Sequence, residues 1–137
     1  MKCPFFLVIG ALVLTSCAGA KCATTDDLRS DLRSAVFLAS ETDLFIGQIE
    51  SRRLLPDLRI AHADYLLGEA RRQAKEARNS GEKSSDAETF NLCAEQLEQL
   101  ARELASIRTP SVTRALAEAR LQVATIRKAL LTAEAGR

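Results

Sequence analysis

The sequence predicts an all-α protein, an up-down-up-down four-helix bundle that follows a cleaved signal peptide. Three observations support this fold class. Ala, Leu, Arg and Glu, which favour helices, dominate the 137 residues, and only 4% of the residues are aromatic. Apolar residues recur at steps of three and four along four segments, with no long run that alternates with a period of two. Short connections join the segments, so neighbouring helices must run antiparallel.

The first predicted helix covers about 26–53. Acidic residues in its first turn, Asp26 and Asp27, suit the positive end of the helix dipole. Phe37 and Leu44 project away from its apolar face and are either covered by another helix or exposed. If this helix is bent or loosely docked, the fold is a three-helix bundle instead, and this alternative stays open. The apolar face consists of Leu28, Leu32, Ala35, Ala39, Thr42, Ile46 and Ile49.

The second predicted helix begins at Pro56, because proline ends the preceding helix and suits a first helical turn. It ends at Asn79, where Ser80 and Gly81 provide a stop. The third helix opens with Ser85-x-x-Glu88, which has the form of a capping box. The fourth follows Thr109-Pro110. The three apolar faces are Ile60, Ala63, Leu67, Ala70, Ala74 and Ala77; Phe90, Cys93, Leu97, Leu100, Leu104 and Ile107; and Val112, Leu116, Ala119, Val123, Ile126, Leu130 and Ala133.

The N-terminal segment has the features of an export signal. Phe5 to Leu14 is apolar over about ten residues, whereas a membrane-spanning helix needs roughly 20. Leu14-Thr15-Ser16-Cys17 follows, and these four residues resemble the lipobox of bacterial lipoproteins. The resemblance implies cleavage before Cys17 and attachment of palmitate-type lipid to its sulfur and amine. It divides the chain into a signal peptide (1–16), a lipidated tether (17–24) and a helical bundle domain (25–137).

The residue after the lipidated cysteine bears on location. An aspartate there would imply retention at the inner membrane of a Gram-negative cell, and this chain has Ala18. The resemblance therefore implies a cell-envelope protein anchored in the outer membrane and facing the periplasm. Ala18-Gly19-Ala20 provides an alternative cleavage site, before Lys21, which would release a soluble periplasmic or secreted protein.

Charge and motif content argue against several function classes. The 19 Lys and Arg residues and 18 Asp and Glu residues become 18 of each once the signal peptide with Lys2 is removed, so we expect no nucleic-acid partner. A single histidine cannot build the paired Glu-x-x-His motifs of a di-iron bundle. Haem-attachment, phosphate-loop and Gly-x-Ser-x-Gly motifs are missing from the sequence. We expect no enzyme activity, no catalytic residues, no metal and no cofactor.

The turn after the first helix is a candidate partner contact. Arg52 and Arg53 stand beside Leu54 and Leu55, and arginine with apolar side chains is typical of interaction hot spots. The alternative is that both leucines cap the bundle core.

His62 and Tyr65 form a second candidate. In a hairpin of the first two helices, His62 should lie level with Gly47, a glycine whose place in mid-helix suggests the close approach of something bulky. The pair is either a polar packing contact between the helices or a site for a ligand or metal.

Cys22 and Cys93 remain after processing and are candidates for a disulfide, because an exported compartment is oxidising. Geometry favours the alternative. Cys93 belongs to an apolar face about 12 Å above the start of its helix, whereas Cys22 lies in the tether. We expect Cys93 to be a buried thiol and Cys22 to be free or available to a partner's cysteine.

Two functions are consistent with these features. The first is a lipid-anchored interaction or scaffold module of the cell envelope, with the membrane and a protein of unknown identity as partners. The second is an exported protein that holds a small apolar ligand between its helices.

Overall fold

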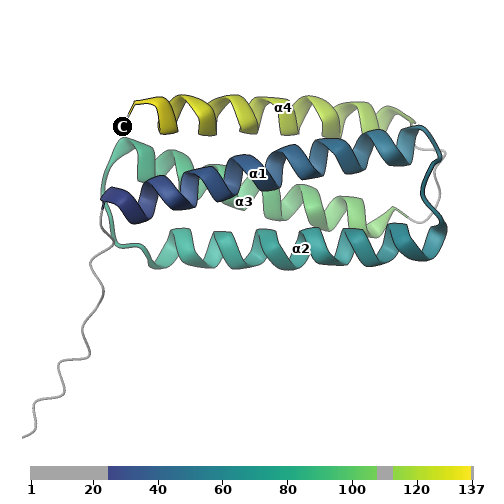
Figure 1. Cartoon of the computed structure of the whole chain (residues 1–137), viewed down its shortest axis with the longest axis horizontal. Helices are drawn as coiled ribbons and strands as arrows, with labels where there is room; N and C mark the ends of the chain where they lie inside the picture. The colour runs from purple at the N-terminus through teal and green to yellow at the C-terminus, as the bar shows by residue number, and fades with distance from the viewer. Residues whose placement is uncertain (1–24, 108–112, 137) are drawn as a thin grey trace, which may run out of the picture.

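The computed structural model describes residues 25–107 and 113–136, which form an up-down-up-down four-helix bundle. The helices are α1 (Thr25–Glu50), α2 (Pro56–Asn79), α3 (Ser85–Ser106) and α4 (Thr113–Ala135). The start of α1 and the end of α4 lie at the same end of the bundle (Figure 1). The predicted fold class is confirmed, and α1 is a full member of the bundle. The signal peptide, the tether, Cys17 and Cys22 lie outside the described residues.

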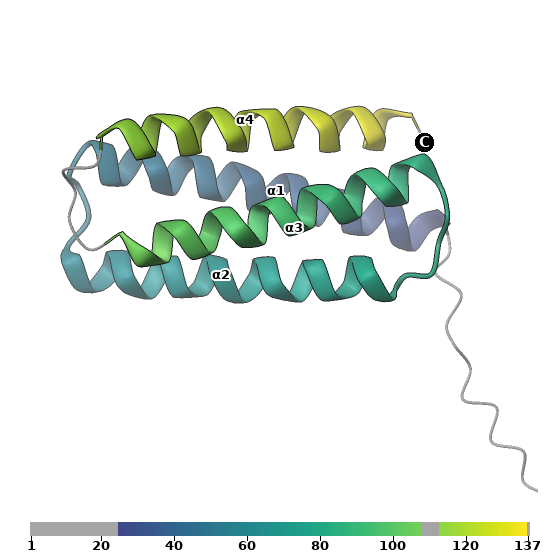
Figure 2. The same ribbon diagram turned by 180° about the vertical axis from the view of Figure 1, so that it is seen from behind.

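The four helices do not contact one another equally. In the two opposite views, α2 and α4 lie on opposite sides of the bundle, with α1 and α3 between them (Figures 1 and 2). The most extensive contacts join α2 to α3 and α1 to α4, and α1 also reaches α3 across the diagonal. Contacts between α1 and α2 are sparse for helices of this length. This seam leaves room for one of the surface grooves of the bundle.

The predicted apolar faces of α1 and α3, and the described part of the face predicted for α4, form the core. The Thr109-Pro110 start predicted for the fourth helix, and Val112, lie outside the described residues. All seven residues proposed for α1 are buried, and Phe90 and Leu130 are among the large side chains that are almost fully enclosed. The face predicted for α2 is partly wrong, because Ile60 is 42% exposed while Leu66 is 1% exposed. The helix is rotated so that Leu66 points into the core, since adjacent leucines at 66 and 67 allow either orientation. Within the described helices, none has the length and apolar character needed to cross a membrane.

Helix ends follow the expected chemistry with two corrections. Gly81 has a φ of 65°, the left-handed conformation expected after α2. Ser84, not Ser85, caps α3: its hydroxyl accepts a hydrogen bond from the Ala87 backbone N–H at 3.1 Å. The first helix ends at Glu50, three residues earlier than predicted.

Candidate functional site

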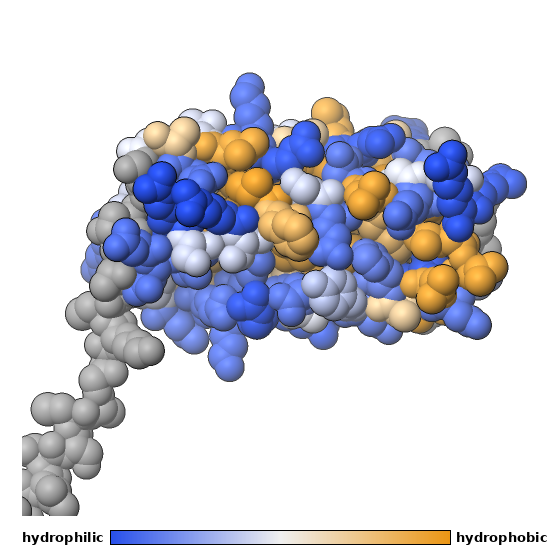
Figure 3. Space-filling view, viewed as in Figure 1, coloured by the Kyte–Doolittle hydropathy of each residue, from blue (hydrophilic) through white to orange (hydrophobic). Residues whose placement is uncertain are grey.

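We call the turn from Arg52 to Leu55, together with Leu58, the distal tip, because it lies at the opposite end of α1 from Thr25, where that helix begins (Figure 1). The 26 residues of α1 separate the two ends by about 39 Å at a rise of 1.5 Å per residue. Apolar side chains gather at this end of the molecule, on the right in Figure 3.

The two leucines of the predicted contact have different environments. Leu54 packs against the core and is partly buried. Leu55 is 68% exposed, and Leu58, one helical turn further along, is 57% exposed. Arg52 and Arg53 are both exposed. Leu54 therefore caps the core, as the alternative interpretation held. Leu55 remains a candidate for the contact with a partner. Leu58 was absent from the prediction, although its spacing of three from Leu55 places both on one side of the chain.

Both helix ends that meet at the distal tip carry residues that disfavour local stability. The end of α1 is a Schellman motif, in which the Arg53 N–H donates to Gln48 O at 3.2 Å and the Arg52 N–H donates to Ile49 O at 3.0 Å. The left-handed position of this motif usually holds glycine, and here Arg52 occupies it with a φ of 53°.

The N-cap of α2 also holds a residue type that is unfavourable for its position. Leu55 is the N-cap residue, and its side chain provides no capping hydrogen bond. Ser, Thr, Asp and Asn are favoured at this position because their oxygens accept from the first free N–H groups of the helix. An exposed leucine there gives neither a cap nor core packing.

His62 and Tyr65 line the seam between α1 and α2. The His62 ring lies 4.8 Å from the Phe45 ring and 5.8 Å from the Tyr65 ring, centroid to centroid. His62 Nε2 lies 3.7 Å from Glu41 Oε1. His62 therefore contacts Phe45 and Glu41 of α1, whereas Tyr65 lies on α2 three residues after His62. Gly47 faces elsewhere: a Cβ there would lie 3.4 Å from Nη2 of Arg120, so the bulky neighbour comes from α4.

A surface groove of about 370 Å³ runs along this seam, and we call it the α1–α2 groove. Two aromatic residues that line the groove have large exposed fractions, 68% for Phe37 and 50% for Tyr65. Phe37 is therefore one of the outward-facing residues that no other helix covers. The residues that line the groove are Arg33, Ser34, Phe37, Leu38, Glu41, Tyr65, Glu69, Arg72 and Gln73.

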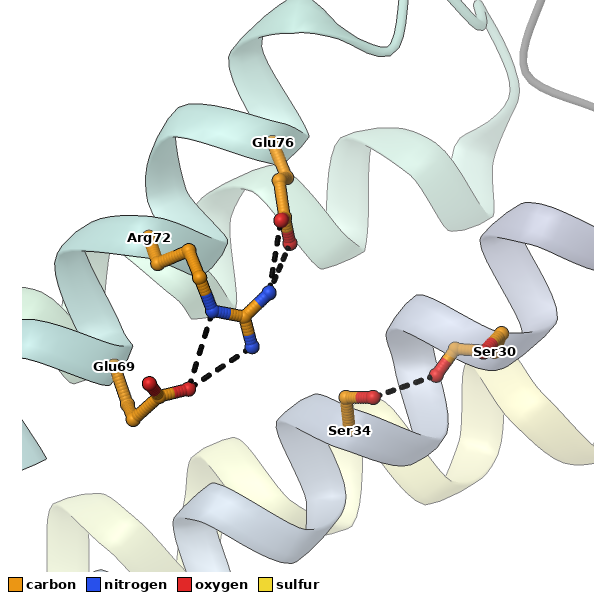
Figure 4. A network of polar contacts seen from close by, with 5 residues as sticks. All are labelled: Ser30, Ser34, Glu69, Arg72 and Glu76. Atoms are coloured by element: carbon orange, nitrogen blue, oxygen red, sulfur yellow. Dashed lines mark hydrogen bonds and ion pairs between the residues drawn. The ribbon is translucent and has the colours of Figure 1, made fainter.

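Charged side chains of both signs line the α1–α2 groove: Glu41 and Glu69 are acidic, and Arg33 and Arg72 are basic. Arg72 extends from α2 and is held between Glu69 and Glu76, with N–O distances of 2.9 Å and 2.8 Å (Figure 4). Across the seam, burial raises the pKa of the Asp31 carboxyl, and the charges of Glu76 and Asp27 raise it further. The positive charge of Arg72 lowers the pKa of Asp31, but the effect of burial is the largest and the pKa stays raised.

Two oxygen atoms in the groove lack hydrogen-bond donors. Gln73 is 4% exposed, and its Oε1 is buried without a partner. Glu41 Oε2 is likewise buried without a partner. Sequence reasoning missed Gln73, whose only signal was a polar residue beside the alanine stripe of α2. Over the part of the chain that the structure describes, no group of three or more His, Cys, Asp and Glu side chains is arranged to hold a metal ion.

Cys93 is a buried free thiol at 2% exposure, as the core position predicted. Burial raises its pKa above the ordinary value, because the thiolate is disfavoured away from water. That Cys22 does not pair with Cys93 stays a prediction, since Cys22 lies outside the described residues.

Comparisons with protein-family models, with curated proteins and with solved structures return no significant match for this chain. Its class is accordingly defined by the fold alone, as a four-helix bundle, and its function is argued from its own geometry.

Proposed function

We propose that the protein is a lipid-anchored interaction module of the cell envelope, whose bundle presents its distal tip to a protein partner. The lipobox resemblance supports attachment through Cys17. The topology supports the direction of presentation, because the chain enters α1 at the end opposite the tip.

One observation supports the partner contact: two adjacent helix ends at the distal tip have residues that lower local stability. Arg52 occupies a left-handed position that suits glycine, and Leu55 occupies an N-cap that suits a hydroxyl or carboxylate side chain. Both side chains are exposed, so core packing does not compensate for the loss of local stability at either position. Residues that oppose local stability without a folding reason are expected where a surface has another role. Arginine beside exposed leucine is the composition of a binding hot spot.

Anchoring is tested by Cys17→Ser. Each methylene of an attached acyl chain contributes about 0.8 kcal/mol of membrane binding, and the substitution removes the attachment sulfur. We expect wild-type protein in the outer-membrane fraction and Cys17→Ser released or unprocessed. Intact-mass measurement of wild-type protein distinguishes the lipidated form from a soluble chain cleaved before Lys21. A wild-type protein recovered wholly in the soluble fraction would contradict the anchor.

The tip contact is tested by photo-crosslinking in cells. A photoreactive residue is placed at Leu55 and, as a matched control, at Leu121, an equally exposed leucine on α4. We expect one discrete protein adduct from position 55 and none from position 121. Leu55→Asp should abolish formation of that complex while the domain remains folded, because aspartate is favoured at an N-cap. The same adduct from both positions, or a complex insensitive to Leu55→Asp, would refute the proposal.

A further inference from the structure

The distal tip carries positive charge that the bundle does not neutralise. Most arginines in the described part of the chain are held by a carboxylate, on the same helix or across a seam. Arg52 and Arg53 are exposed, and no carboxylate among the described residues forms an ion pair with either of them. Residues 52–59 contain three arginines and one acidic residue, Asp57, so the net charge of this segment is positive.

The acidic residues at the adjoining end of α1 are already engaged with α4. Nη1 of Arg120 lies 2.7 Å from Oε2 of Glu50, and its Nε lies 3.4 Å from Oδ1 of Asp43. Arg127 also pairs with Asp43, at 3.8 Å. These two acidic and two basic side chains balance one another across the seam. The charges of Arg52 and Arg53 are therefore left for a group from outside the chain.

A second surface groove continues from the distal tip along this seam, and we call it the α1–α4 groove. Its volume is about 590 Å³, and Arg53 and Leu54 of the tip are part of its wall. Leu44 also lines it and is 63% exposed. Ten residues separate Leu44 from Leu54, so the groove extends about 15 Å from the tip, a length that about five residues of extended chain cover.

The combination of charge and apolar surface specifies the occupant. Guanidinium groups without an internal partner are suited to bidentate pairing with carboxylates. Exposed leucines at the tip and in the groove lose contact with water when apolar side chains cover them. A polypeptide with both acidic and apolar side chains satisfies both requirements, whereas a free phosphate group has no apolar surface.

We propose that the partner presents an acidic segment with interspersed apolar residues to the distal tip and the α1–α4 groove. This inference rests on the proposed function and specifies the chemistry of that partner. Carboxylates of the segment pair with Arg52 and Arg53, and its apolar side chains cover Leu55 and Leu44. Opposite charge increases the association rate and selects among partners, because like-charged surfaces are repelled.

The sign of the charge is tested with two synthetic peptides and the purified full chain in non-ionic detergent. One fluorescent peptide of about 12 residues contains leucines interspersed with glutamates, and in the other every glutamate is replaced by glutamine. Fluorescence anisotropy measures both dissociation constants. We expect the glutamate peptide to bind at least about fivefold more tightly at low salt, and this advantage to shrink at about 0.5 M salt, where surface charges are screened.

Matched variants locate the binding site. Arg53→Gln removes one charge from the groove and should weaken binding of the glutamate peptide by at least about threefold. Arg29→Gln should leave it unchanged, because Arg29 is also exposed and outside any ion pair of the described residues but lies at the other end of α1. Leu44→Ala should weaken binding, whereas Leu121→Ala, at an equally exposed leucine outside this groove, should not.

Equal affinity for the two peptides, or equal effects of Arg53→Gln and Arg29→Gln, would overturn the proposal. It would also be overturned if the Cys17→Ser protein bound vesicles of anionic phospholipid through Arg52 and Arg53 more tightly than the glutamate peptide, because the surface would then be a lipid site. Photo-crosslinking from position 55 separates this inference from the proposed function. An adduct that persists in the double variant Arg52→Gln, Arg53→Gln would contradict only the acidic segment, whereas the absence of any adduct in wild type would contradict the tip contact itself.

Discussion

Arg52→Gly is expected to stabilise the protein, because Arg52 has a φ of 53° at the end of α1. A residue with a Cβ in the left-handed helical conformation is disfavoured by about 1–2 kcal/mol, and glycine is free of this strain. Glycine also increases the conformational entropy of the unfolded chain, and this effect offsets about 0.4–1 kcal/mol of the stabilisation gained from relieved strain. The net gain in the free energy of unfolding should be about 0.5–1 kcal/mol.

Arg53→Gly is the matched control for this prediction. Arg53 is exposed, adjacent and outside the left-handed region, so its replacement brings only the entropic loss of about 0.4–1 kcal/mol. Urea unfolding followed by far-UV circular dichroism measures both variants, which remove the same charge. The two free energies of unfolding should differ by about 1–2 kcal/mol, with Arg52→Gly above wild type and Arg53→Gly below it. Equal losses in both variants would refute the idea that strain is stored at the distal tip.

Three further predictions concern other parts of the bundle. Leu54→Ala should lower the free energy of unfolding by about 1–2 kcal/mol because Leu54 packs on the core, whereas Leu55→Ala should change it by less than about 0.5 kcal/mol; urea unfolding of both variants checks this. Asp31→Asn should stabilise the protein at neutral pH, where the Asp31 carboxylate is charged although burial and then the charges of Glu76 and Asp27 disfavour that form. This gain should shrink as the pH falls through the raised pKa of Asp31; unfolding midpoints at pH 3 to 7 measure it, and a gain that grows on acidification would contradict the sign. Thiol alkylation without reductant should label Cys22 quickly and Cys93 only after unfolding, and an unreactive pair would instead indicate their disulfide.

The distal tip shows how far sequence reasoning can reach at a functional candidate. The pairing of arginines with leucines was visible in the sequence, and so was the break at Pro56. The different roles of Leu54 and Leu55 were not visible, because adjacent residues in a turn point in directions that the local pattern does not determine. The left-handed Arg52 was also hidden, since the sequence has no glycine where the helix-ending motif normally has one.

The α1–α2 groove was even less accessible to prediction. His62 could be placed against α1 by counting residues back from the turn, and in the structure its ring lies 4.8 Å from the ring of Phe45. Gln73 could not be recognised as buried, because a glutamine beside alanines is equally consistent with a solvated face. Its burial depends on the rotation of α2 that also places Leu66 inside and Ile60 outside.

The sequence by itself determined four amphipathic helices, their approximate ends and their antiparallel order, because the three-four spacing of apolar residues and the action of Pro56 and Gly81 are local effects. Tertiary structure decided the rotation of α2, the sparse contact between α1 and α2, and the close approach of Arg120 to Gly47. These features arise from packing between segments far apart in the chain. A helix with two acceptable apolar edges takes the orientation that buries the most area against all of its neighbours together, and no single segment contains that information.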